Sequence, residues 1–122
     1  MDLVLKTMIA AVESGGEVLK KYFGESLAVE EKTHVFNFRT KADLESEEKI
    51  LHVLIQNFPD YNLLSEEAGF LDKKSEFTFV LGLPYFSINL ALLKGEEVIA
   101  GVVGNPILDR IYFAEKGWGF FR

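Results

Sequence analysis

The apolar residues change their spacing at Pro59, and this change constrains the fold more than any other feature of the sequence. From Asp2 to Phe23, and again from about Ala42 to Phe58, apolar side chains recur every three or four residues, the period of an amphipathic helix. After Pro59 the chain becomes a series of short runs rich in Val, Ile, Phe and Tyr, which is typical of strands. The pattern therefore predicts two helices followed by a sheet, an α+β arrangement rather than alternating βαβ units.

The first predicted helix contains two adjacent glycines, Gly15 and Gly16, which cost about 2 kcal/mol relative to alanine. We expect them to allow close packing against a neighbouring element, and a break in the helix is the alternative. Residues 30–39 are predicted to be irregular or weakly extended, with Thr40 as the cap of the second helix. Pro59 marks the end of that helix.

The second predicted helix has an apolar stripe, which we expect to be buried, and a charged face, which we expect to meet water. The stripe consists of Leu44, Ile50, Leu51, Leu54, Ile55 and Phe58, and the charged face consists of Glu45, Glu47, Glu48 and Lys49.

The second half of the chain is predicted to form a mostly antiparallel sheet on which the two N-terminal helices pack. The short link Lys94-Gly95-Glu96 predicts a hairpin between the strands on either side of it. The predicted strands are Asn62 to Ser65, Phe77 to Leu81, Phe86 to Leu93, Val98 to Gly104 and Arg110 to Glu115.

Length and composition narrow the possible functions. The 122 residues predict one domain, with a helical part at 1–58 and a sheet part at 59–122. The net charge of −6 lacks clustered Lys and Arg, which argues against nucleic acid as a partner. No cysteine is present, so disulfides, thiolate metal sites and a cysteine nucleophile are excluded, and the cytoplasm is the expected location. No apolar run is long enough to predict a membrane span, and Asp2 does not suit a secretory signal.

Several weak signals do not predict a site. Gly117-Trp118-Gly119 has no helix after it that could accept a pyrophosphate, so we interpret its two glycines as turn residues. His34 and His52 have no second metal ligand at helical or hairpin spacing and are interpreted as surface residues. The remaining candidates are carboxylates: Asp43 near the start of the second helix, and Glu66-Glu67 after a predicted strand. Taken alone, Asp43 is better interpreted as a partner of the helix dipole, and Glu66-Glu67 as a solvated pair in a loop.

The order of several short motifs resembles the inositol monophosphatase family, whose pattern includes Thr-x-Ala-Asp, Phe-Pro-Asp and Gly-Glu-Glu. The resemblance covers essentially the whole chain and implies the front part of that fold. The segments that carry it are Thr40-Lys41-Ala42-Asp43, Phe58-Pro59-Asp60, Ser65-Glu66-Glu67, Gly82 to Ile88, Gly101-Val102-Val103, Asn105-Pro106 and Ala114 to Phe121.

The resemblance implies hydrolysis of small phosphate monoesters with Mg²⁺ held by carboxylates and by the substrate phosphate. Glu66 resembles the family's metal-ligating glutamate, and Asp43 resembles the aspartate that, with a threonine, orients and activates the attacking water. Lys32 resembles a lysine near the phosphate site. Glu67 is interpreted as a loop residue or a support for the site.

Two parts of the family pattern are absent from the sequence. Between Val80-Leu81 and Gly82-Leu83-Pro84 the family carries Asp-Pro-x-Asp-Gly-Thr, which supplies two metal-binding aspartates and the threonine that partners Asp43. The family's C-terminal half, with a further metal ligand, is also absent, so substrate choice within the wider superfamily of fructose bisphosphatases and nucleotidases is left open.

Three hypotheses follow. The first is a Mg²⁺-dependent phosphatase of this family, present as a fragment or decayed copy with weak or lost metal binding, which would take a small phosphate monoester if active. The second is a non-catalytic module that forms a homodimer or binds another chain through an exposed sheet face. The third is an unrelated α+β domain whose motifs match by chance.

Overall fold

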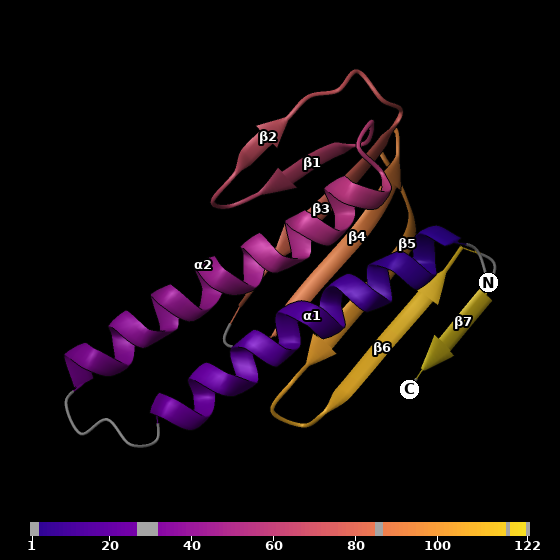
Figure 1. Cartoon of the computed structure of the whole chain (residues 1–122). Coiled ribbons are helices and arrows are strands. Elements are labelled where there is room, and N and C mark those ends of the chain that lie inside the picture. The colour runs from indigo at the N-terminus through magenta and orange to yellow at the C-terminus, as the bar shows by residue number, and fades with distance from the viewer. Residues whose placement is uncertain (1–2, 27–31, 85–86, 117, 122) are drawn as a thin grey trace.

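Two long helices form the N-terminal part of the computed structural model, which describes residues 3–26, 32–84, 87–116 and 118–121, without the side chains of 25–26, 32–40 and 118–121. Helix α1 spans Leu3–Ser26 and α2 spans Lys32–Asn57. They lie side by side and antiparallel, as Figure 1 shows. The prediction for residues 32–39 and for Thr40 as a cap is wrong, since α2 runs through both. No Gly or Pro occurs between Lys32 and Asn57 to interrupt this helix.

The contact between the helices explains the first glycine of α1. A Cβ atom on Gly15 would lie 2.5 Å from Ile50 Cδ1 and 2.8 Å from Ser46 Oγ. The Ser46 hydroxyl donates a buried hydrogen bond of 2.9 Å to the Gly15 carbonyl. The prediction of close packing at Gly15 is therefore confirmed, and α1 continues without a break.

The buried face of α2 is narrower than the predicted stripe. Ile50 and Leu54 are fully buried and Leu51 and Phe58 are half-buried, but Leu44 and Ile55 are about 40% exposed. The buried positions follow a four-residue step through Ala42, Ser46, Ile50 and Leu54. Leu44 and Ile55 lie off this line, which is why their expected burial is wrong.

One sheet contains the seven strands of the described residues, in the order β2-β1-β3-β4-β5-β6-β7. All neighbouring pairs are antiparallel except β1 and β3, so the predicted mostly antiparallel sheet is confirmed. The strands are β1 Asn62–Ser65, β2 Gly69–Leu71, β3 Phe77–Gly82, β4 Ile88–Lys94, β5 Glu97–Asn105, β6 Arg110–Glu115 and β7 Trp118–Phe121.

The predicted strands were found, together with two short edge strands that the sequence did not predict. The β4–β5 hairpin turns at Gly95, whose φ of 62° suits glycine, and this prediction is confirmed. Trp118 and Gly119 belong to β7 and pair with Glu115 and Ala114, so the interpretation of Gly119 as a turn residue is wrong. Gly117 and the predicted strand start at Phe86 lie outside the described residues.

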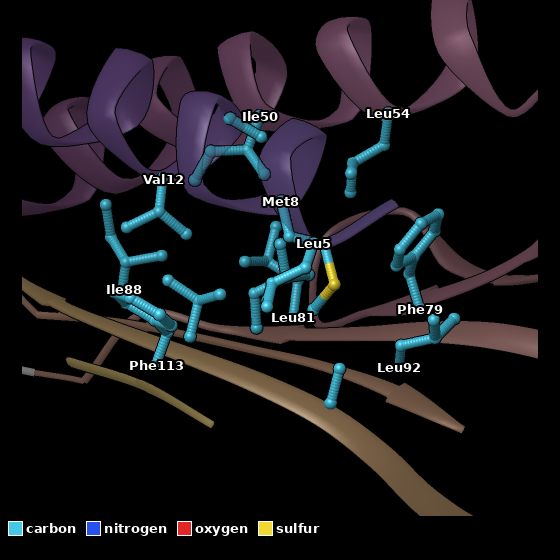
Figure 2. Packing of buried hydrophobic residues seen from close by; sticks show 14 of the residues in the cluster. Leu5, Met8, Val12, Ile50, Leu54, Phe79, Leu81, Ile88, Leu92 and Phe113 are labelled. Atoms are coloured by element: carbon cyan, nitrogen blue, oxygen red, sulfur yellow. The ribbon is translucent and has the colours of Figure 1, made fainter. Parts of the chain in front are cut away.

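Both helices cover the same face of the sheet (Figure 1), and the core lies between these layers (Figure 2). Met8 and Val12 from α1, Ile50 and Leu54 from α2, and Phe79 from β3 are among its fully buried members. Gly104 in β5 lets α1 approach closely, since a Cβ there would lie 2.5 Å from Val12 Cγ1.

The opposite face of the sheet is not covered by the described helices. The strand register places one row of apolar or small residues on this face, crossing six strands: Phe70, Leu64, Val80, Ala91, Gly101 and Ala114. Leu64 is 42% exposed and Phe70 56% exposed. We call this row, with the exposed Val103 beside it, the open face.

Candidate functional site

Strands β1, β3 and β5 run in the same direction and end at one edge of the sheet. β1 is parallel to β3, and β5 is related to β3 through the antiparallel β4. Ser65, the last residue of β1, pairs with Leu81, one residue before the end of β3. The residues that directly follow β1 and the residues that directly follow β3 therefore lie next to each other at this edge.

Glu66 follows β1 at this edge, in the tight turn that leads into β2. Its neighbour Ser65 is buried, and Ser65 Oγ accepts a hydrogen bond of 3.1 Å from the Ala68 N–H. Gly69, with a φ of 70°, ends the turn and pairs with Ser65. The Glu66 side chain is exposed, so its carboxylate is accessible to a ligand.

Asp43 lies near the middle of α2. The residue is half-buried, and its Oδ1 atom is shielded from solvent. One helical turn further on lies Glu47, on the same side of the helix. Asp43 is therefore carried by a rigid element whose next turn meets the sheet.

Glu47 connects α2 to the turn that carries Glu66. Only 5% of Glu47 is exposed, and its carboxylate faces three hydrogen-bond donors, the Ser65 hydroxyl and the N–H groups of Glu67 and Ala68. Burial raises the pKa of this carboxyl, the nearby negative charge of Glu67 raises it further, and the three hydrogen bonds offset part of the shift. The prediction that Glu47 faces water is wrong. A four-residue step from Asp43, next to the buried Ser46, was the signal that could have found it.

The structure does not bring Lys32 to these carboxylates. Lys32 is the first residue of α2, eleven residues before Asp43. At about 1.5 Å of rise per residue this places their backbones about 16 Å apart along the helix axis. The Lys32 side chain lies outside the described part of the structure, and so does that of His34. His52 is exposed, as expected for a surface residue.

The segment that joins β3 to β4 carries no acidic residue. Residues 83–87 make the connection, and Ser87 donates to the Pro84 carbonyl from both its N–H, at 2.9 Å, and its hydroxyl, at 2.6 Å. The end of β3, which lies beside Glu66, therefore offers no carboxylate. Among the described residues no group of three or more His, Cys, Asp or Glu side chains is placed to hold a metal ion. The carboxylates present do not fit a resident Mg²⁺ ion.

A cavity of about 350 Å³ lies between α1 and the β5–β6 connection. Its charged lining residues are Glu13, Glu17, Lys20, Asp109 and Arg110, and Lys20 Nζ lies 3.2 Å from Asp109 Oδ1. Neither Asp43 nor Glu66 contributes to it, so the cavity and the candidate carboxylates are separate features.

Neither described helix is long and apolar enough to cross a membrane.

Comparison with known proteins gives one consistent result. The sequence model of the inositol monophosphatase family matches residues 1–122. A fructose-1,6-bisphosphatase/inositol-1-monophosphatase of Aquifex aeolicus is 36% identical, over 93% of this chain and 47% of its own length. An inositol-1-monophosphatase of Caulobacter vibrioides is 32% identical, over 93% of this chain and 50% of its own length.

Solved structures show the same fold. The extragenic suppressor protein SuhB of Bartonella henselae superposes with a TM-score of 0.83 at 26% identity, covering 98% of this chain and 51% of that protein. The inositol monophosphatase of Thermotoga maritima gives a TM-score of 0.71 at 31% identity, covering 93% of this chain and 49% of that protein. The chain thus spans about half the length of the relatives that it matches.

Proposed function

This chain belongs to the inositol monophosphatase family, and from that premise we propose that it is the front half of a Mg²⁺-dependent phosphate monoesterase. The whole domain would hydrolyse inositol phosphate or a related sugar phosphate. The observation that carries the proposal is the link through Glu47, which joins the helix bearing Asp43 to the turn bearing Glu66. The two motifs that resemble the family's catalytic carboxylates thus lie on elements that are connected through one residue.

Each candidate residue has a chemically reasonable role in this proposal. Asp43 would accept a hydrogen bond from the attacking water and orient it, since a shielded carboxylate is a suitable base. Glu66 would offer a hard, accessible oxygen donor, the kind of ligand that Mg²⁺ prefers. Lys32 would bind phosphate only if the segment before Asp43 folded back toward it, because the helix holds the two apart. We assign Glu67 to the support of the turn.

By itself this chain should not turn over substrate. Mg²⁺ gives up its water reluctantly and is held by several oxygen ligands, including those of the substrate phosphate. The end of β3 supplies none, and no group of three metal-binding side chains exists among the described residues. We therefore expect Mg²⁺ binding to be weak or lost. With no cysteine to oxidise, we expect the protein in the cytoplasm.

The test is hydrolysis of inositol monophosphate by the purified chain with and without Mg²⁺. Asp43→Asn and Glu66→Gln are the site variants, and Glu48→Gln, which removes one charge from an exposed position of α2, is the control. We expect no turnover from any of them in protein shown to be folded. Mg²⁺-dependent turnover that both site variants abolish would support the roles of Asp43 and Glu66 and refute the inactivity of the chain.

The open face favours a second function, a non-catalytic module that associates with a second copy of the chain. Its row of apolar and small residues crosses most of the sheet, and Leu64, Phe70 and Val103 are each more than 40% exposed. Exposed apolar patches of this kind are typical of interaction sites. A dimer of defined mass would support this function, whereas soluble aggregate of undefined mass would indicate a decayed copy.

A further inference from the structure

Glu47 is a buried carboxylate to which neither proposed function gives a chemical step. It is 5% exposed, whereas its neighbour Glu48 on α2 is exposed. Burying a carboxylate is unfavourable unless hydrogen-bond donors surround it. Its presence at this position therefore needs a compensating role, and its contacts indicate which one.

The hydrogen-bond donors that face the Glu47 carboxylate in the described part of the chain belong to one turn. The Ser65 hydroxyl precedes Glu66, and the N–H groups of Glu67 and Ala68 follow it. Ser65 Oγ also accepts the Ala68 N–H at 3.1 Å, so the turn is closed on itself as well as fixed to α2. The Glu66 side chain takes no part in these contacts and faces solvent, as do the side chains of Glu67 and Ala68.

We propose that Glu47 is a positioning residue, which fixes the turn of residues 65–68 against α2 and so sets the place of Glu66 relative to Asp43. This role rests on the proposed function of Asp43 and Glu66. Because Asp43 and Glu47 are one turn apart on a rigid helix, holding the turn to Glu47 also holds it to Asp43. A site built this way keeps its geometry before any ligand arrives.

A carboxylate suits this role better than an amide or an apolar side chain. Three donors converge on it, and a carboxylate has acceptor sites for all of them. Glutamine has nearly the same shape but presents an NH₂ group to at least one of the N–H donors. Glu47→Gln should therefore release part of the turn while leaving the helix packing in place.

The experiment is amide hydrogen exchange by NMR on Glu47→Gln, Ser65→Ala and the double variant, with Glu48→Gln as the matched control. We expect exchange at Glu67 and Ala68 to accelerate about tenfold in Glu47→Gln, as for loss of a hydrogen bond to a charged group. Exchange at Phe79 and Leu81 in β3 should be unchanged, as should all exchange rates in the control. In the double variant the acceleration of exchange should be smaller than the product of the accelerations in the two single variants, because Glu47 and Ser65 act on the same turn.

Residual dipolar couplings of the N–H groups of residues 65–68 give a second measurement, which reports the orientation of the turn rather than stability. They should change relative to α2 in Glu47→Gln and stay constant in Glu48→Gln. Unchanged exchange and unchanged couplings in folded Glu47→Gln would overturn the proposal. If Glu47→Gln accelerates exchange throughout the core, Ser65→Ala decides: faster exchange confined to Glu67 and Ala68 supports the proposal, and none overturns it.

The outcome is separable from that of the proposed function. Glu66→Gln leaves the contacts of Glu47 in place and should not change exchange at Glu67 or Ala68. If the roles of Asp43 and Glu66 fail in the hydrolysis test, the turn is still fixed by Glu47 and its exchange still responds. If exchange does not respond, the roles of Asp43 and Glu66 are untouched and only the positioning is wrong.

Discussion

At the scale of single residues, Glu47 makes the stability of the fold depend on pH. Burial and the charge of Glu67 raise its pKa above the ordinary value of 4.5. A carboxyl with a raised pKa binds more protons in the folded protein than in the unfolded one. Its stabilising contribution is therefore fully present below the unfolded pKa and is lost as the pH rises through the folded pKa.

Glu47→Gln removes this titration, so we predict that the difference in unfolding free energy changes with pH in a defined direction. As the pH rises through the folded pKa, which lies above 4.5, the variant should gain stability relative to the wild type, whatever its absolute stability. Urea denaturation at several pH values measures this difference. Glu48→Gln corrects for the loss of one charge from α2. A difference that stays flat, or favours the wild type as pH rises, would contradict the prediction.

At the scale of elements, the packing of α1 on α2 depends on one of two adjacent glycines. Gly15 has no room for a methyl group against Ile50 and Ser46, whereas the nearest atom to a Cβ on Gly16 would be Pro106 Cβ at 3.6 Å, an ordinary contact. The two positions share the same helix and the same propensity. They differ in what lies next to them.

Gly15→Ala should destabilise the protein although alanine is the better helix former. Overpacking costs about 1–3 kcal/mol, which exceeds the gain of about 1 kcal/mol in helix propensity. Gly16→Ala, the matched control, should instead stabilise by about 0.5–1 kcal/mol. Thermal and urea unfolding of both variants measure this. Equal stability of the two would mean that the helices are not in the close contact described.

The elements also show what the sequence could predict and where local pattern was insufficient. Strands β1 and β6 have the predicted bounds, because both are short apolar runs with clear ends. The predicted start of α2 was about ten residues too late. The apolar residues in its first turns do not follow a helical period, so the sequence pattern did not indicate that the helix begins there. β2 and β7 are edge strands whose pairing with β1 and β6 is not visible in their own residues.

The candidate site divides in the same way. Asp43 and Glu66 were selected by motif, and the fold connects the two elements that bear them. Glu47 was missed because an apolar stripe was expected, and its burial depends on donors contributed by a turn nearly twenty residues away. Lys32 was selected by spacing from Asp43, and spacing along the chain becomes distance along a helix when the segment is helical.

At the scale of the whole molecule, the open face is the surface that we expect to mediate association with a second copy of the chain. A stable dimer needs roughly 1,200–2,000 Å² of buried surface in total. The row from Phe70 to Ala114 crosses six of the seven strands. The small side chains of Ala91, Gly101 and Ala114 leave the centre of this face flat.

If the open face forms a dimer, a charge placed on it should dissociate the dimer without unfolding the chain. Leu64→Arg and Val103→Arg should each raise the dissociation constant at least about tenfold, because an unpaired buried charge is strongly unfavourable at an interface. Leu44→Arg, on the exposed side of α2, is the control. Sedimentation velocity over a range of concentrations measures the equilibrium. Equal effects of all three variants would exclude the open face as the interface.

The central claim is that Glu66 is correctly placed to bind a metal ion at the sheet edge and lacks the ligands that the end of β3 would supply. The most direct test inserts the family's Asp-Pro-x-Asp-Gly-Thr stretch between Leu81 and Gly82 and measures Mg²⁺ binding by titration calorimetry. We predict that binding appears in the folded insertion variant, is lost with Glu66→Gln and survives Glu48→Gln. A folded insertion variant that binds no Mg²⁺, or binds it equally well with Glu66→Gln, would contradict the claim.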